Sequence, residues 1–283
     1  MFHEGAGRSL VQERRVGPYV LFDRRALLGA LDPALLRQIT LLEIHDSLPS
    51  TNERLLQVPD TPTAGSLAVC LTGHQSAGRG RNGKSWHAPA GAGLLLSVSR
   101  TAPKTPDGSL ALALGVAIAE GLETFVSDRV ELKWPNDLVA RDRKLGGILV
   151  ETSSQGGAET RVVAGLGINI RVNEEQRKLV TGEGNMHPAG LSELNLQKAP
   201  EPNVLAAAMI TAIAGVLESH PVDGFGRWTD GWNRRDWLAG KRIEASSGAD
   251  THVGTATGVD SSGALLLEES GGERRILSAE IRL

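Results

Sequence analysis

The sequence predicts an α+β fold, in which a mixed, mostly antiparallel β-sheet is backed by helices and followed by a small C-terminal β-barrel. Two apolar runs, residues 144–151 and 160–170, flank the turn SSQGG and indicate an antiparallel hairpin. Helical and strand patterns alternate through residues 33–237. From Gly240 onward only short β runs remain, separated by SSG, DSSG and SGG turns, a pattern typical of a small barrel.

Apolar periodicity and capping residues place the elements of the larger part in order. Asp32 and Pro33 suit the cap and the first position of a short helix, and Ser50 suits the cap of a second one. Helical patterns cover residues 33–39, 50–57, 109–126, 203–217 and 224–237. Strand patterns cover residues 39–44, 66–72, 93–100, 130–134, 144–151 and 160–170.

Length and composition are those of an ordinary globular protein. The 283 residues allow one large domain and a small appendage, and the pattern changes predict three parts, residues 1–40, 41–238 and 239–283. A formal net charge of −3 gives no field that would attract DNA or an anionic membrane. The N-terminus lacks the apolar core of a signal peptide, and the longest apolar stretch contains Glu120 and Glu123. We therefore expect a cytoplasmic protein that binds neither membranes nor nucleic acids.

Several residues are best interpreted as core. Cys70, the single cysteine, lies in the apolar run SLAVCL and is expected to be a buried hydrophobic residue, because no catalytic partner is evident. Three tryptophans near the end of the larger part have near-helical spacing, which favours packing over ligand binding: Trp228, Trp232 and Trp237.

A glycine-rich stretch, GHQSAGRGRNGKSWHAPAGAG, follows the strand predicted at residues 66–72. Residues 78–85 match the phosphate-binding pattern G-x-x-x-x-G-K-[ST], but that motif needs a helix directly after the loop, and SWHAPAGAG cannot form one. The loop still concentrates Arg79, Arg81 and Lys84 among glycines. Arginine is a forked and permanently charged donor for phosphate or carboxylate, and glycine lets the backbone approach a ligand. We expect a mobile lid over a phosphorylated ligand.

Five motifs in order resemble those of the biotin–protein ligase family. They are Ser50-Thr51-Asn52, Gln75 with GRGRNG and Trp86, KWPND (133–137), RKLGGILVE (143–151) and GLGIN (165–169). The resemblance covers residues 46–170, and residues 240–283 are similar to the C-terminal domain of the same enzymes. It implies the sheet architecture shared by biotin ligases and class II aminoacyl-tRNA synthetases, with a catalytic domain at residues 41–238.

The resemblance also implies a role for individual residues. The residues expected around biotin are Ser50, Thr51, Asn52, Gln75, Arg79, Gly80, Arg81 and Lys144. The residues expected around ATP are Trp86, which would pack on the adenine, and Asn136, Asp137, Gly147 and Asn169. The expected catalytic groups are the cations Lys144, Arg79 and Arg81, because the reaction joins two anions, the biotin carboxylate and the α-phosphate.

The expected small molecules are biotin, ATP and Mg²⁺, with Asp137 as a candidate ligand for the metal. The expected partner is the biotin carboxyl carrier protein of acetyl-CoA carboxylase. Some members of the family carry a DNA-binding winged helix-turn-helix, but the residues before Asp46 are too few for one, and residues 17–33 resemble at most a remnant of its wing. The sequence leaves open whether two copies form a homodimer.

Three other functions stay open at this point. A lipoate- or octanoyl-protein ligase of the same superfamily would have a similar fold. A biotin sensor without ligase activity would keep the pocket, and a P-loop hydrolase would use the glycine loop.

Some motif residues also have a purely structural interpretation. Trp134 would be core, Asn136 and Asp137 would form a turn, and Lys144 would be a solvated strand end. The pair Gly146-Gly147 would mark a β-bulge.

Overall fold

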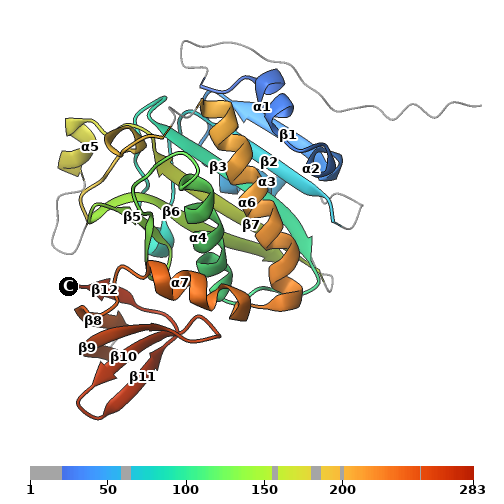
Figure 1. Cartoon of the computed structure of the whole chain (residues 1–283). Helices are drawn as coiled ribbons and strands as arrows, with labels where there is room; N and C mark the ends of the chain where they lie inside the picture. The colour runs from blue at the N-terminus through green and yellow to red at the C-terminus, as the bar shows by residue number, and fades with distance from the viewer. Residues whose placement is uncertain (1–20, 59–64, 155–158, 180–185, 198–200, 249) are drawn as a thin grey trace, which may run out of the picture.

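A seven-stranded mixed sheet is the frame of the molecule (Figure 1). The computed structural model describes residues 21–58, 65–154, 159–179, 186–197, 201–248 and 250–283. The sheet has the order β1-β2-β3-β7-β6-β5-β4, in which β1 pairs with β2 in parallel and every other pair is antiparallel. The strands are β1 (Ile39–His45), β2 (Leu67–Thr72), β3 (Gly93–Ala102), β4 (Glu131–Lys133), β5 (Asp137–Ala140), β6 (Arg143–Ser154) and β7 (Thr160–Asn169). The expected mixed, mostly antiparallel sheet is confirmed.

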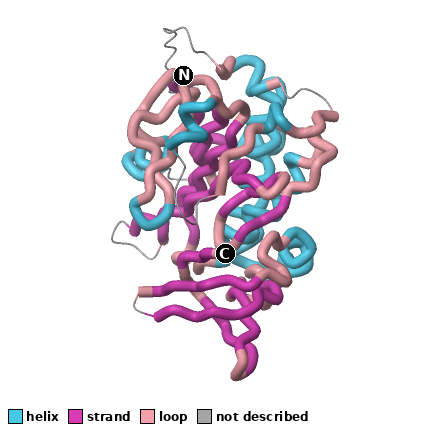
Figure 2. The backbone as a smooth tube through the Cα atoms, turned by 90° about the vertical axis from the view of Figure 1, so that its left-hand side faces the viewer, coloured by secondary structure: helices cyan, strands magenta, loops and turns pink. Residues whose placement is uncertain are grey.

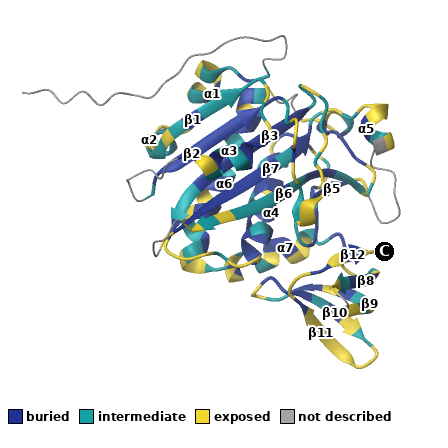
Figure 3. Cartoon of the chain, turned by 180° about the vertical axis from the view of Figure 1, so that it is seen from behind, coloured by how far each residue is buried: buried dark blue, intermediate teal, exposed yellow. Residues whose placement is uncertain are grey.

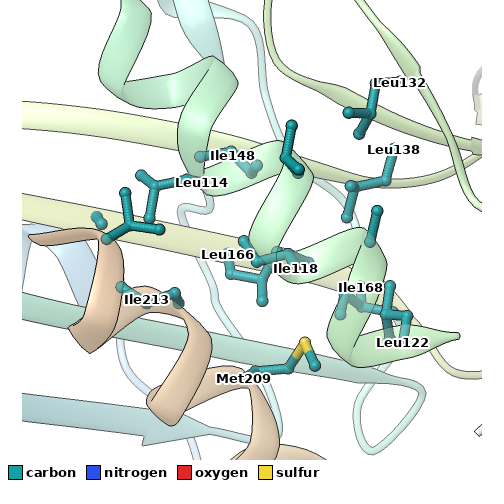
Figure 4. Close-up of a cluster of buried hydrophobic side chains, with 14 of the residues drawn as sticks. Leu114, Ile118, Leu122, Leu132, Leu138, Ile148, Leu166, Ile168, Met209 and Ile213 are labelled. Atoms are coloured by element: carbon teal, nitrogen blue, oxygen red, sulfur yellow. The ribbon is translucent and has the colours of Figure 1, made fainter. Parts of the chain in front are cut away.

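Helices α4 (Ser109–Leu122) and α6 (Pro202–Asp223) cover one face of this sheet and form the main core with it. Figure 4 shows Leu114 and Ile118 of α4 and Met209 of α6 facing Leu166 and Ile168 of β7. Each of these side chains is at most 3% exposed. Burial on this scale is the largest favourable contribution to folding.

Helix α3 (Thr51–Gln57) lies on the opposite face of the sheet, over a second and smaller core. Because side chains alternate along a strand, Leu67, Val69 and Leu71 of β2 point to the main core, whereas Ala68 and Cys70 point to α3. The strand is therefore buried on both sides, as the dark blue of β2 shows in Figure 3. Burial raises the pKa of the Cys70 thiol to about 12, which agrees with its expected role as a packing residue.

The remaining helices are short. Helix α1 (Arg24–Ala30) is capped by Asp23 and packs against α6, and α2 (Pro33–Gln38) is capped by Asp32 as predicted. The segment compared with a remnant of a wing, residues 17–33, contains α1 and the first residue of α2, and residues 17–20 lie outside the described part. The others are α5 (Glu174–Leu179), α7 (Thr229–Arg235) and the 3₁₀ turns η1 (Arg81–Gly83), η2 (Leu191–Glu193) and η3 (Gly226–Trp228).

Helix α6 is the one described helix that is long and apolar enough to span a membrane by length and composition. More than half of its apolar window, 56%, is buried inside the molecule, where it packs against α4 and α1. These contacts identify α6 as a core helix. It runs six residues beyond the predicted segment and ends where Gly224 takes a φ of 65°, a conformation that glycine adopts without strain.

The C-terminal part is a separate five-stranded antiparallel sheet with the order β11-β10-β9-β8-β12 (Figure 2). Its strands are β8 (Arg242–Ser247), β9 (Asp250–Val259), β10 (Leu265–Glu269), β11 (Gly272–Ile276) and β12 (Glu280–Arg282). Strand β12 lies next to the larger part, where Glu280 forms an ion pair with Lys84. The buried indole of Trp134 also donates a hydrogen bond to the Gly263 carbonyl at 3.1 Å. The small sheet is thus attached beside the KWPND turn.

Two further predicted helices differ from the structure in their limits. The helix expected at residues 224–237 is a 3₁₀ turn followed by α7, and Trp232 and Trp237 are buried as expected. The helix expected to reach residue 126 ends at Leu122, where Thr124 donates its hydroxyl to a carbonyl of the last turn. In the second case, a polar side chain that hydrogen-bonds to the backbone ends the helix within an otherwise apolar run.

Asp236, just after α7, makes the stability of the fold depend on pH. Burial raises the pKa of this carboxyl from 3.8 to about 6, and its Oδ2 atom has no partner among the described residues. A folded-state pKa above the unfolded value means that the protonated form is favoured by folding, so stability falls as pH rises from about 4 to about 6.

We expect Asp236→Asn to raise the free energy of unfolding by about 1–3 kcal/mol at pH 7, because the neutral amide carries no charge into the buried site. At pH 3 the two proteins should be equally stable. Urea unfolding at both pH values measures this, and an equal difference at pH 3 and pH 7 would contradict the assignment.

Candidate active site

The first turn of α3 supplies one end of the site. Ser50 caps the helix, which turns the next two side chains toward the sheet. The amide and the hydroxyl of Thr51 both donate to Oε1 of Gln75, at 2.8 and 3.1 Å. The buried hydroxyl of Ser97, on β3, lies 2.7 Å from Oγ1 of Thr51 and 2.6 Å from Oδ1 of Asn52. This end is polar and uncharged.

Glu151, on β6, connects this polar end to the glycine-rich loop. Its carboxylate accepts a hydrogen bond from Nδ2 of Asn52 at 2.8 Å and another from Nη2 of Arg79 at 3.1 Å. Gly165 of β7 lies beneath Asn52, and a Cβ atom at this glycine would overlap Oδ1 of Asn52. The polar end therefore depends on a residue without a side chain at position 165.

The loop after Gly78 is a small closed hairpin and is not followed by a helix. Trp86 donates its amide to the Gly78 carbonyl at 2.9 Å, and Gly80 donates to the Lys84 carbonyl at 2.7 Å. Asn82, at the tip in η1, has a φ of 54°. The backbone that would hold phosphate at a helix N-terminus is thus absent from residues 78–92, which argues against the P-loop hydrolase that the sequence left open.

Glycines of the central strands form the floor of the site. The Trp86 ring lies against Gly147 of β6 and Gly167 of β7, where added Cβ atoms would lie 3.4 and 2.7 Å from it. Gly146 meets the backbone of β7, and the register between β5 and β6 shifts beside it, so the expected bulge is present. The floor lets a flat group lie directly on the backbone.

Cationic side chains line the cavity beside this floor. Nζ of Lys144 lies 2.7 Å from Oδ1 of Asp137 and 5.7 Å from the centre of the Trp86 ring. Burial lowers the pKa of the Arg81 guanidinium, and it also lowers the pKa of Lys133, which is 8% exposed. Charges held in such partly dry surroundings interact strongly with an anionic ligand.

These groups surround one cavity of about 580 Å³. It is lined by all of the predicted site residues, Ser50, Thr51, Asn52, Gln75, Arg79, Gly80, Arg81, Trp86, Asn136, Asp137, Lys144, Gly147 and Asn169. Trp134 also borders the cavity, but it is buried and belongs to the main core, so its structural interpretation is borne out. Asn136 lies in the turn before β5 and donates to the Ile148 carbonyl at 2.8 Å.

Several residues of the site were not assigned by sequence reasoning. Gln176 on α5 and Glu280 on β12 line the cavity, whereas Ser97 and Glu151 support it from outside. Glu151 carried a signal, since it ends the motif RKLGGILVE. Gln176 and Glu280 reach the cavity from segments outside the five motifs.

Fold and cavity together define a class of enzyme domain that holds a polyanion beside a small neutral polar group. Five lysine and arginine side chains line the cavity against two carboxylates, those of Asp137 and Glu280. Comparison with known proteins identifies the family. Residues 44–169 match the biotin/lipoate A/B protein ligase family, and residues 239–283 match the biotin protein ligase C-terminal domain.

The bifunctional ligase/repressor BirA of Escherichia coli is 33% identical over 99% of this chain and 82% of its own length. The biotin–[acetyl-CoA-carboxylase] ligase of Paracoccus denitrificans is 30% identical over 82% of this chain and 96% of its own length. The biotin protein ligase of Aquifex aeolicus, solved with biotin and ATP, has the same fold, with a TM-score of 0.70 at 23% identity over 85% of this chain and 97% of its own. The chain belongs to the biotin protein ligase family.

Proposed function

We propose that this chain is an ATP-dependent biotin–protein ligase, which forms biotinyl-5′-AMP and transfers the biotin to a lysine of the biotin carboxyl carrier protein of acetyl-CoA carboxylase. One observation carries the proposal. The cations of Arg79, Arg81 and Lys144 border the same cavity as an uncharged polar end and a glycine floor. The uncharged polar end suits a neutral ring, the cations suit a carboxylate and phosphates, and the glycine floor suits the base of a nucleotide.

The polar end is assigned to the ureido ring of biotin. The ring is neutral and offers two N–H donors and one carbonyl acceptor, which suits hydroxyl and amide side chains better than charged ones. Asn52, Thr51 and Gln75 are already held by Ser97, by Glu151 and by one another, so they need little reordering on binding. The sequence motifs imply a biotin-binding role for the same residues.

The first chemical step joins two anions. An oxygen of the biotin carboxylate attacks the α-phosphorus of ATP, and the bond from that phosphorus to the pyrophosphate oxygen breaks. Lys144 and Arg81 are assigned to the charge that develops on the phosphoryl oxygens. In the second step the acceptor amine attacks the acyl carbon, loses a proton and displaces AMP.

The nucleotide is assigned to the floor beside Trp86. Gly147 and Gly167 let the Trp86 indole lie flat on the floor, and this indole is assigned to stack on the adenine, because aromatic rings stack favourably. Asn136 and Asn169 also line the cavity. Arg79 is assigned to the phosphate and to the biotin carboxylate, because its guanidinium lines the cavity and Glu151 holds it at the polar end.

Mg²⁺ is part of the proposal, and the donor set fits a weakly protein-bound ion. Asp137 and Glu280 are the carboxylates that line the cavity in the described structure, and each is paired with a lysine. Asp137 would offer one oxygen, as is usual for Mg²⁺ held mainly by phosphate oxygens and water. The ion would neutralise charge on the leaving pyrophosphate.

A lipoate- or octanoyl-protein ligase is the second candidate, because the family matched by residues 44–169 includes both activities. The match of residues 239–283 to the biotin protein ligase C-terminal domain favours biotin. Exchange of labelled pyrophosphate into ATP separates the two when it is measured with biotin, lipoate or octanoate. We expect exchange with biotin alone, and exchange driven by octanoate or lipoate would overturn the assignment.

Gly165→Ala tests the polar end. The added methyl group would displace the Asn52 amide, which would then lose its contacts with Ser97 and Glu151. We expect the KM for biotin to rise by about 10- to 100-fold, the effect of losing one or two buried hydrogen bonds, with little change in the KM for ATP. Gly215→Ala is the control, since a Cβ there meets nothing within 4 Å. An equal rise in both KM values would point to general damage to the fold.

A further inference from the structure

Gln176 is a buried glutamine on α5 that the motifs of the sequence do not include. Its side chain is 3% exposed and lines the cavity. The Oδ1 atom of Asn173 accepts a hydrogen bond from the backbone N–H of Gln176 at 2.8 Å. This bond caps the first turn of α5 and fixes the direction of the glutamine. The segment that carries it comes directly after β7, the strand that forms part of the floor.

The hydrogen bonds of Gln176 fix which end of its amide faces which neighbour. Nε2 donates to Oδ1 of Asn169 at 3.0 Å and to the backbone carbonyl of His87 at 3.1 Å. A backbone carbonyl can only accept, so the amide cannot be turned around. Asn169 is fixed in the same way, because its Nδ2 approaches the Lys144 carbonyl at 3.4 Å.

The other atom of this amide, Oε1 of Gln176, is buried and has no hydrogen-bond partner within the described ranges. A buried acceptor without a donor is uncommon in folded proteins and points to a group that arrives from outside. The surroundings of this oxygen place it at the end of the cavity that is assigned to the nucleotide. His87 follows Trp86, and Asn169 lies four residues along an extended strand from Gly165, about 13 Å from the polar end assigned to the ureido ring.

We propose that Gln176 selects the nucleobase, with its Oε1 atom accepting a hydrogen bond from the exocyclic amino group of adenine. This inference rests on the proposed function, in which the base lies beside Trp86. Adenine presents an N–H donor at carbon 6, whereas guanine presents a carbonyl oxygen, which would face Oε1 with like charge. Gln176 also positions the floor, since one amide group connects Asn169 with the segment that follows Trp86.

The test compares ATP with purine riboside 5′-triphosphate, which lacks the 6-amino group, in the unaltered chain and in Gln176→Met. Removing the amino group should lower kcat/KM of biotin-dependent pyrophosphate exchange by about 10- to 100-fold in the unaltered chain, because Oε1 is then left unpaired. Gln176→Met also loses the contacts with His87 and Asn169, so it should lower kcat/KM for both nucleotides, but the decrease should be about 10- to 100-fold larger for ATP than for the purine nucleotide. The preference for the amino group then disappears.

A merely structural role would lower kcat/KM for both nucleotides equally, so an unchanged preference in Gln176→Met overturns the inference, as does an unaltered chain without any preference. Gln57→Met, at an exposed glutamine on α3, is the matched control. Calorimetric binding of AMP and of purine riboside 5′-monophosphate gives a second measurement that needs no turnover. If biotin drives no exchange with any nucleotide, the proposed function fails, and the calorimetry still decides whether Gln176 reads the amino group.

Discussion

Lys144→Ala is expected to lower biotin-dependent pyrophosphate exchange by at least about 10²-fold, the usual effect of removing one group that stabilises charge in a transition state. The ammonium lies at the junction of the two ends of the cavity, paired with Asp137 and above the Trp86 ring. A neutral side chain there leaves the carboxylate and the α-phosphate to repel each other. The loss should appear mainly in kcat, since the Lys144 ammonium attracts the phosphoryl oxygens most strongly in the transition state, when charge moves onto them.

Two further variants separate the role of Lys144 from damage to the fold. Lys104→Ala removes a lysine that is exposed and outside the cavity, and it should leave the exchange unchanged. Lys144→Arg keeps the charge and the pairing with Asp137, and it should retain part of the activity. Full exchange activity in a folded Lys144→Ala protein would remove this residue from the mechanism.

Arg81→Gly is expected to leave the fold intact and to release biotinyl-5′-AMP about 10- to 100-fold faster, the range for the loss of charged hydrogen bonds. The guanidinium is partly buried and lines the cavity, and it belongs to the glycine-rich hairpin. Escape of the reactive anhydride should cause labelling of nearby amines on proteins other than the carrier. Release is measured by rapid filtration of the labelled intermediate from the enzyme.

The control for Arg81→Gly is Arg129→Gly, at an exposed position in the loop before β4. This variant should release the intermediate at the unaltered rate. Retention of the adenylate by Arg81→Gly at that same rate would show that the hairpin holds the intermediate without this arginine.

Much of the fold follows from the local pattern of the chain. Asp32 before Pro33 and Ser50 before Thr51 cap their helices as predicted, since capping needs only residues close in sequence. The hairpin of β6 and β7 also follows from its alternation and its turn. Strand β5 was missed, because four residues after a turn carry too little periodicity to be distinguished from the turn itself.

The sequence motifs contain many of the residues that line the candidate cavity, whereas residues that reach it through tertiary contacts could not be predicted. Lys144 and Arg81 lie within recognisable runs, and the structure brings them to one cavity. Glu280 comes from a strand almost 200 residues away from its partner Lys84. Gln176 depends on how a short helix packs after β7, which no local pattern specifies. Long-range neighbours of this kind become visible only once the sheet order is known.

The thiol of Cys70 is the single one in the chain, and it lies under α3 with a pKa near 12. At neutral pH it is protonated and inaccessible, so maleimide and iodoacetamide reagents would meet no competing target in the native protein. A cysteine introduced at Ser85, which is exposed in the glycine-rich hairpin, would therefore accept a fluorophore or a spin label selectively. Movements of that hairpin during turnover would then become directly observable without any prior removal of native cysteines.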